Sequence, residues 1–123
     1  MSIRYSIEVR DLYLYLAGEG TEAGLEENVE IHRIILDACK EHHRQRVLID
    51  DRNVIYTASV ISLYTLAKQY AEVDVHRFIK RAALLANEAY RTENQFFEDT
   101  MRNRNINLRV FYDLEEAEKW LTI

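Results

Sequence analysis

The sequence predicts an α/β fold in which a mixed sheet of about five strands packs against four helices. Short apolar segments alternate with longer segments in which apolar residues recur every three or four positions, as in βαβ units. The first two strand-like segments are adjacent in the sequence, which favours an antiparallel hairpin at the start. We therefore expect the order ββαβαβαβα, with right-handed crossovers between the parallel strands.

The first two strands and the first helix follow from local patterns. Tyr5–Val9 alternates apolar and polar residues, as a half-buried strand does. Leu12–Ala17 places leucines on one face and tyrosines on the other, and Gly18 and Gly20 close it. A helical pattern then runs from about Leu25 to His42. The predicted apolar stripe of this helix consists of Leu25, Val29, Ile31, Ile35, Leu36, Ala38 and Cys39.

Three further strands alternate with helices. Arg46–Asp50 is a short, mostly apolar run, typical of a strand that is covered on both faces. A second helix is predicted over Ser59–Val73, followed by a buried strand at Lys80–Ala86. A third helix spans about Glu88 to Arg104, and Leu108–Tyr112 is the last strand.

The final helix carries its own start signal. Asp113 precedes it and Glu116 follows three residues later, which is the spacing of a capping box. Ala117, Trp120 and Leu121 recur at helical spacing, so we expect them to face the sheet.

Composition excludes several classes of protein. The chain has 123 residues, of which 48% are hydrophobic and 30% charged, as in a single globular domain spanning residues 1–123. It contains no apolar run of about 18 residues and no N-terminal signal core, so we expect a cytoplasmic protein without a transmembrane segment. A net charge of −5 argues against nucleic-acid binding, which usually requires a basic face.

Polar residues follow two of the predicted strands, where ligands bind in open α/β sheets. Asp50 and Asp51 follow one strand, while Asn87, Glu88 and Arg91 follow the next. These residues could bind a small polar ligand or a partner, or they could simply cap helices and solvate loops. An enzyme that uses Asp50, Asp51, Glu88 and Arg91 is the third alternative.

No motif predicts a catalytic residue, a cofactor or a metal site. The glycines match neither phosphate-binding pattern, and the nucleophile-elbow motif is absent. Cys39 lies on an apolar stripe, which indicates a buried, inert thiol. The histidines show no ligand spacing with Cys39; they are His32, His42, His43 and His76.

Aromatic residues indicate a pocket or an interface. The chain has eight tyrosines, and tyrosine suits both settings because its ring is apolar and its hydroxyl polar. Tyr56, Tyr64, Phe96 and Phe97 could line a pocket for a small hydrophobic or lipid-like ligand. Exposed aromatics could equally support a homodimer, and ordinary core packing is the simplest alternative.

The C-terminal segment resembles a known family. Met101–Asp113, followed by Glu115–Leu121, is similar to the C-terminal signature of SpoIIAA-like proteins of bacteria and archaea. These proteins resemble the STAS domains of anti-sigma-factor antagonists and are related in fold to CRAL-TRIO lipid-transfer domains. Asn105 stands where family members often have glycine, and asparagine also tolerates the left-handed conformation that ends a helix. The resemblance implies a STAS-like domain used for protein–protein signalling rather than catalysis.

The same resemblance points to a regulatory serine. In STAS antagonists a serine at the start of the second helix is phosphorylated within an Asp-Ser-Ser-Gly-like motif. Ser59 is the matching position and Thr57 the next, but Ala58 replaces the aspartate and the glycine is absent. The resemblance therefore implies a partner-binding loop over Asp51–Ser59, whereas a plain N-cap at Thr57 or Ser59 is the alternative. The first hypothesis is a non-enzymatic binding or regulatory domain that forms a homodimer and whose working surface includes the Asp51–Ser59 loop and the second helix. A carrier of a hydrophobic ligand is the second.

Overall fold

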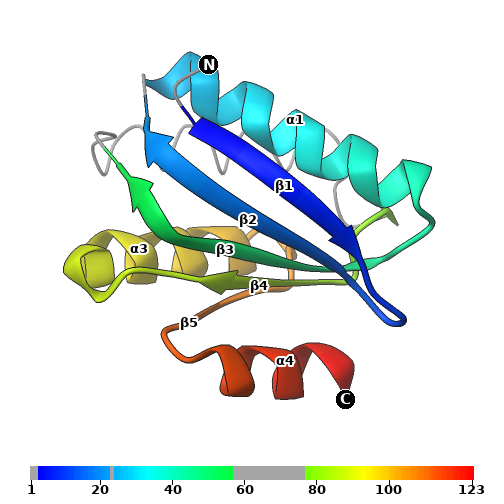
Figure 1. The fold of residues 1–123 in the computed structure, drawn as a ribbon. Helices are drawn as coiled ribbons and strands as arrows, with labels where there is room; N and C mark the ends of the chain where they lie inside the picture. The colour runs from blue at the N-terminus through cyan, green and yellow to red at the C-terminus, as the bar shows by residue number, and fades with distance from the viewer. Residues whose placement is uncertain (1–2, 23, 57–76) are drawn as a thin grey trace.

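The computed structural model describes residues 3–22, 24–56 and 77–123, with only the backbone of Leu25. They form one five-stranded sheet in the order β1-β2-β3-β4-β5, shown in Figure 1. β1 and β2 are antiparallel, and β2 to β5 run parallel to one another, as predicted. The strands are β1 (Ile3–Val9), β2 (Leu14–Thr21), β3 (Arg46–Ile55), β4 (Arg81–Leu85) and β5 (Leu108–Phe111).

Three α-helices lie within the described residues. They are α1 (Leu25–Glu41), α3 (Arg91–Arg102) and α4 (Leu114–Thr122), and the 3-10 turn η2 (Glu88–Tyr90) precedes α3. The predicted helix over 59–73 lies outside the described residues, as do Thr57, Ser59 and Tyr64.

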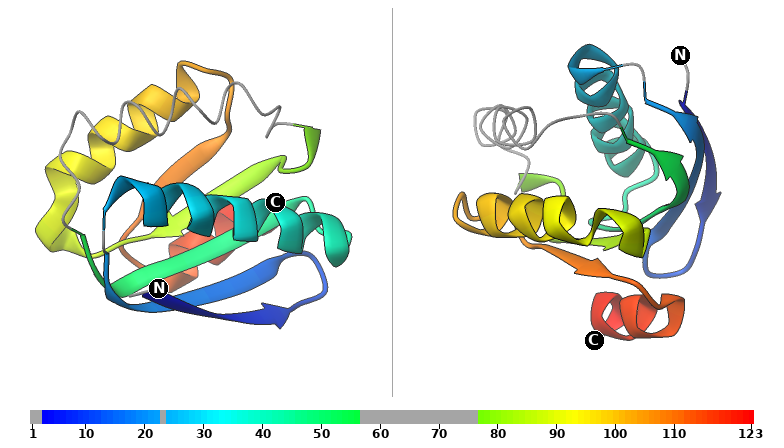
Figure 2. Two further views of the ribbon diagram at one scale, coloured as in Figure 1. Left: turned by 90° about the horizontal axis from the view of Figure 1, so that it is seen from above. Right: turned by 90° about the vertical axis from the view of Figure 1, so that its left-hand side faces the viewer.

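The helices cover opposite faces of the sheet. Figure 2 shows α1 and α3 on one face, here called the α1 face, and α4 on the other, the α4 face. A hydrophobic core lies on each face of the sheet, and the larger one is on the α1 face. Side chains of β3 alternate between the two cores, because Val47 and Ile49 face α1 while Leu48 faces α4. Leu48 packs with Ala117 and Leu121 of α4, and both of these helix residues are fully buried.

Two predicted details of local structure are confirmed. The Asp113 side chain accepts a hydrogen bond from the backbone N–H of Glu116, which caps α4 as the spacing indicated. Asn105 has φ of 64°, the left-handed conformation expected at the end of α3.

Several predicted boundaries and one predicted core residue are wrong. β2 continues through both glycines to Thr21, and β3 extends to Ile55, because parallel pairing between them carries both strands onward. α3 begins at Arg91 because Asn87 caps a separate 3-10 turn first. Val29 is 38% exposed, so the buried side of α1 excludes it.

A β-bulge in β3 changes which residues share a face. Ala17 pairs with Asp50 and Glu19 pairs with Asn53, so the single residue Gly18 lies opposite two residues of β3. Residues an odd number apart in a regular strand face opposite sides. The extra residue shifts the alternation, and Val54 returns to the core on the α1 face, to which Asp51 also belongs.

Candidate functional site

A cavity of about 170 Å³ lies between the α1 face of the sheet and helices α1 and α3. Its described walls are mostly apolar and come from all three sides; they include Ile31, Ile35, Val47, Ile49, Leu84 and Phe97. The rings of His32 on α1 and Phe97 on α3 are 6.3 Å apart between centroids. The cavity therefore lies inside the larger core, in the position where a ligand would contact both helices and the sheet.

One end of the cavity carries a buried carboxylate. Asp51 is only 4% exposed, and both of its oxygens accept hydrogen bonds from tyrosines. Tyr5 Oη donates to Oδ1 at 2.6 Å, and Tyr56 Oη donates to Oδ2. The Tyr56 ring also packs edge-on against Tyr90, whose hydroxyl accepts from the Tyr56 backbone N–H.

Tyr5 reaches Asp51 because a glycine lies between them. Tyr5 is on β1 and Asp51 on β3, two strands away, and Tyr5 pairs directly with Gly18 of β2. A Cβ at Gly18 would be only 2.6 Å from Cε1 of the Tyr5 ring. The ring thus lies across β2 where no side chain stands, and its hydroxyl can reach the third strand.

The bulge brings Tyr56 to the same carboxylate. Tyr56 is five residues after Asp51, so in a regular strand the two side chains would face opposite sides of the sheet. The bulge adds one residue between them, and both now line the cavity.

Burial is the largest influence on the pKa values of the titratable groups around Asp51. The pKa of Asp51 is raised to about 6, mainly by burial and also by the nearby carboxylates of Asp50 and Glu22, although the two tyrosine hydroxyls act in the opposite direction. Burial also raises the pKa of Tyr5 and Tyr56, so both stay protonated as hydrogen-bond donors. Glu22 is 2% exposed and accepts a hydrogen bond from Asn28 Nδ2 on α1.

Two other titratable groups of α1 are held neutral. Burial lowers the pKa of His32, which lines the cavity, to about 3. Burial raises the pKa of the Cys39 thiol to about 11, so this group stays a thiol at neutral pH.

Asp50 belongs to the opposite face and does not join Asp51. Its carboxylate binds the Arg52 guanidinium through two contacts of 2.8 and 2.9 Å and accepts a hydrogen bond from Tyr15 Oη at 2.5 Å. Burial alone would raise the pKa of Asp50, but the hydrogen bonds from Arg52 and Tyr15 hold it below its usual value. Adjacent residues of one strand therefore have separate roles.

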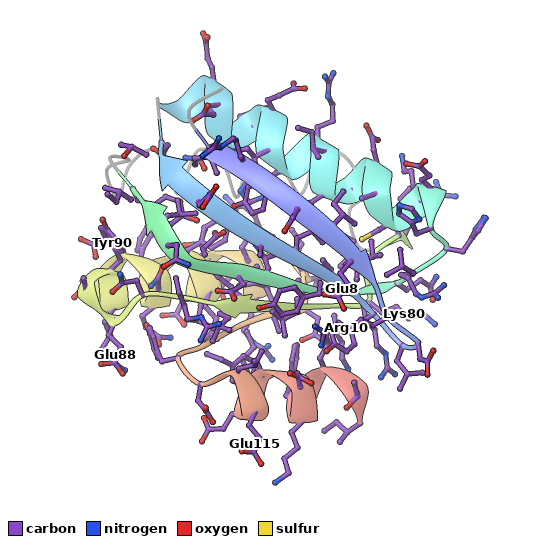
Figure 3. All side chains as sticks on the ribbon, viewed as in Figure 1. Glu8, Arg10, Lys80, Glu88, Tyr90 and Glu115 are labelled. Carbon is purple, nitrogen blue, oxygen red and sulfur yellow. The ribbon has the colours of Figure 1, made fainter. Side chains whose placement is uncertain are left out.

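The polar residues after β4 lie outside the cavity. Asn87 and Glu88 are exposed, and Asn87 accepts the backbone N–H of Ala89 to cap η2. Arg91 forms an ion pair with Glu88 at 3.1 Å and lies over the Tyr112 ring. Figure 3 shows Glu88 directed outward from the sheet. The enzyme alternative requires Asp50, Asp51, Glu88 and Arg91 to converge on one point, and in this structure they do not.

Some of the site residues predicted from the sequence line the cavity and others do not. Asp51, Tyr56 and Phe97 line the cavity, whereas Phe96 is not among its described lining residues. Sequence reasoning missed Tyr5, Glu22, Asn28, His32 and Asn94. The spacing of Asn28, His32 and Ile35 along one side of α1 was the available signal, because it continues the apolar stripe with polar residues.

The described residues contain neither a cluster of metal ligands nor a helix that could span a membrane. Over 3–22, 24–56 and 77–123, no group of three or more His, Cys, Asp or Glu side chains could hold a metal ion. Within those same ranges, no helix has the length and apolar character needed to cross a bilayer.

Comparison with known proteins gives a fold. No family model matches the sequence, and no curated protein matches it. An anti-sigma factor antagonist from Mycobacterium paratuberculosis is similar in structure, with a TM-score of 0.65 and 16% identity over 99% of this chain and 96% of that chain. An uncharacterised DUF3478-family protein with a SpoIIAA-like fold from Shewanella loihica is also similar, with a TM-score of 0.54 and 21% identity over 98% of this chain and 94% of that chain. The chain therefore has the SpoIIAA-like fold that an anti-sigma factor antagonist shares, as its C-terminal segment predicted.

Proposed function

We propose that this chain is a non-enzymatic binding domain whose cavity takes a small, mostly apolar molecule with a cationic or hydrogen-bond-donating group. The observation that carries this proposal is a mostly apolar cavity with a buried carboxylate at one end. This arrangement is typical of ligand pockets, in which apolar walls bind and a few polar groups orient.

The volume limits the size of the ligand. A cavity of about 150 Å³ in another protein binds benzene, so the 170 Å³ here suits a single ring or a short branched chain. This narrows the hypothesis of a lipid-like ligand to a molecule much smaller than a membrane lipid.

The polar end selects the chemistry of the ligand. A carboxylate offers about four lone-pair sites, and the two tyrosine hydroxyls use one on each oxygen of Asp51. A ligand donor can therefore still bind Asp51. The nearby carboxylate of Glu22 favours a cation, and aromatic rings, which also attract cations, line the cavity at Tyr5, Tyr56 and Tyr90.

Titration calorimetry with four benzene derivatives tests this proposal. We expect benzylamine to bind best, benzyl alcohol and toluene more weakly, and benzoate not measurably, because its carboxylate would face Asp51. A charge-assisted hydrogen bond is worth about 1.5–3 kcal/mol, so Asp51→Asn should weaken benzylamine binding by roughly tenfold to a hundredfold. Asp50→Asn is the matched control, since Asp50 faces the other side of the sheet, and its binding should be unchanged.

A second variant distinguishes the contribution of the cavity volume to binding from the contribution of the Asp51 charge. Ala82 lines the cavity, and Ala82→Leu should fill part of it and weaken benzylamine and toluene alike. The proposal is wrong if none of the four compounds binds the wild-type chain. Equal binding of benzylamine and benzoate would leave the cavity as a site and remove the role given to Asp51.

Similarity of fold to an anti-sigma factor antagonist supports a second candidate, a regulatory domain that binds another protein. The matching serine would be Ser59, with Thr57 next, and Asp51 is too buried to contact a partner directly. Mass spectrometry of the protein purified from its own host tests this candidate. It predicts one added phosphoryl group that Ser59→Ala removes and the control Ser62→Ala keeps; an unmodified chain contradicts the phosphorylation switch.

A further inference from the structure

We propose that two copies of this chain associate through β1, so that their sheets join into one continuous antiparallel sheet. β1 is the last strand at one edge of the sheet, and within the described chain it pairs with β2 alone (Figure 1). Such an edge presents backbone N–H and C=O groups that another strand can bind. The sequence of β1 argues that this strand is a second copy of itself.

The hairpin determines which backbone groups face outward. The N–H of Arg10 donates to the C=O of Tyr13 at 3.0 Å, so Arg10 directs its backbone groups towards β2. Backbone groups alternate along an antiparallel strand. The odd-numbered residues of β1 therefore direct theirs to the open edge; they are Ile3, Tyr5, Ile7 and Val9.

One register pairs the whole strand with its copy and matches its charges. With Ser6 on the two-fold axis, all seven residues of β1 find a partner, and Arg4 lies opposite Glu8 of the second copy. Because the axis repeats every contact, the interface holds two such pairs. Arg4 and Glu8 fall at the positions without backbone hydrogen bonds, where opposite side chains come closest. Their side chains are 79% and 63% exposed, so both are accessible to the second copy.

The opposite face of β1 adds apolar contacts in the same register. Ile7 is 43% exposed and Val9 47%, which is high for such residues in a strand. The register places Ile7 opposite Tyr5 of the second copy and Val9 opposite Ile3. Pairing would thus remove exposed apolar surface from water.

The two neighbouring registers lose the Arg4–Glu8 charge pairing and pair fewer residues of β1. Opposite residues must share a face, so the register can shift only in steps of two. One shift places Arg4 opposite Arg10, and the other places Arg4 opposite Ser6. Each shift also leaves residues at one end of both strands unpaired.

Two charge reversals test the interface and its register together. In a homodimer, Arg4→Glu places two carboxylates opposite each other at each Arg4–Glu8 pair, and Glu8→Arg places two guanidinium groups there. Each variant turns two attractive cross-strand pairs into two repulsive ones, so each variant alone should dimerise roughly tenfold to a hundredfold more weakly. An equal mixture of the two variants should form a heterodimer, because both pairs are then complementary again.

Analytical ultracentrifugation of the wild type, the two variants and their mixture gives the result. We expect a dimer, two predominantly monomeric variants and a heterodimer, respectively. Glu19→Gln is the control, because it removes the partner of Arg4 within the chain without altering the β1 edge. A monomeric wild type at every concentration overturns the proposal, and so does a wild-type dimer that neither reversal weakens. Weakened variants that fail to associate in the mixture overturn the register.

Discussion

A side chain at Gly18 of β2 should displace the ring of Tyr5. In Gly18→Ala, the new Cβ would be 2.6 Å from Cε1 and 2.8 Å from Cζ of the Tyr5 ring, which is closer than van der Waals contact permits. The ring must therefore move, and its hydroxyl then leaves Oδ1 of Asp51, which it now reaches at 2.6 Å.

The magnitude follows from three effects. Removing a hydrogen bond to a charged group costs about 1.5–3 kcal/mol. Overpacking costs about 1–3 kcal/mol, while replacing a strand glycine by alanine restores about 0.5–1 kcal/mol. Together these effects should lower the free energy of unfolding of Gly18→Ala by about 1.5–5.5 kcal/mol.

Urea denaturation of a double-mutant cycle measures this directly. Tyr5→Ala removes the ring, so Gly18→Ala in that background should meet no obstacle and become neutral or slightly stabilising. If Gly18→Ala destabilises both backgrounds equally, the loss comes from the backbone of β2 and the account of Tyr5 given above is wrong.

Three further variants have expected outcomes. The folded-state pKa of Asp51, about 6, lies above its ordinary value of 3.8, so the folded chain binds this proton more tightly than the unfolded chain. The free energy of unfolding should therefore fall as the pH rises from 3.8 to about 6. Urea unfolding across this pH range should show no such fall for Asp51→Asn. The pKa of His32 is lowered from 6.5 to about 3, so its contribution is lost as pH falls through that range, and His32→Phe should be less sensitive to acid by the same measurement. Leu121 of α4 is fully buried against the sheet, so Leu121→Ala should cost about 2–5 kcal/mol by urea unfolding and leave benzylamine affinity in calorimetry unchanged.

Local patterns were sufficient to predict most of the fold. Alternation predicted the hairpin of β1 and β2, and the spacing of Asp113 and Glu116 predicted the start of α4. These features depend on residues that are close in the sequence. The ends of β2 and β3 were missed because parallel pairing between distant segments extends both strands beyond their local patterns.

The candidate site was predictable only in part. Asp51 was predicted from its position after a strand and Tyr56 as one of several aromatic residues that could line a pocket. Tyr5 was not predicted, because its role depends on Gly18 leaving room across another strand. The bulge had no sequence signal either, since it is defined by pairing with β2. His32 was missed as well, because the predicted apolar stripe of α1 contained only apolar residues and Cys39, whereas the structure places His32 in the cavity wall.

The bulge in β3 also affects how distant relatives of this chain should be aligned. A relative with a regular strand here lacks one residue between the positions equivalent to Asp50 and Val54. An alignment without a gap would match Tyr56 to a residue whose side chain faces the other side of the sheet. A deletion of one residue near Arg52 should therefore accompany the loss of the tyrosine–carboxylate pair, and its presence or absence separates relatives that keep this cavity from those that share only the sheet.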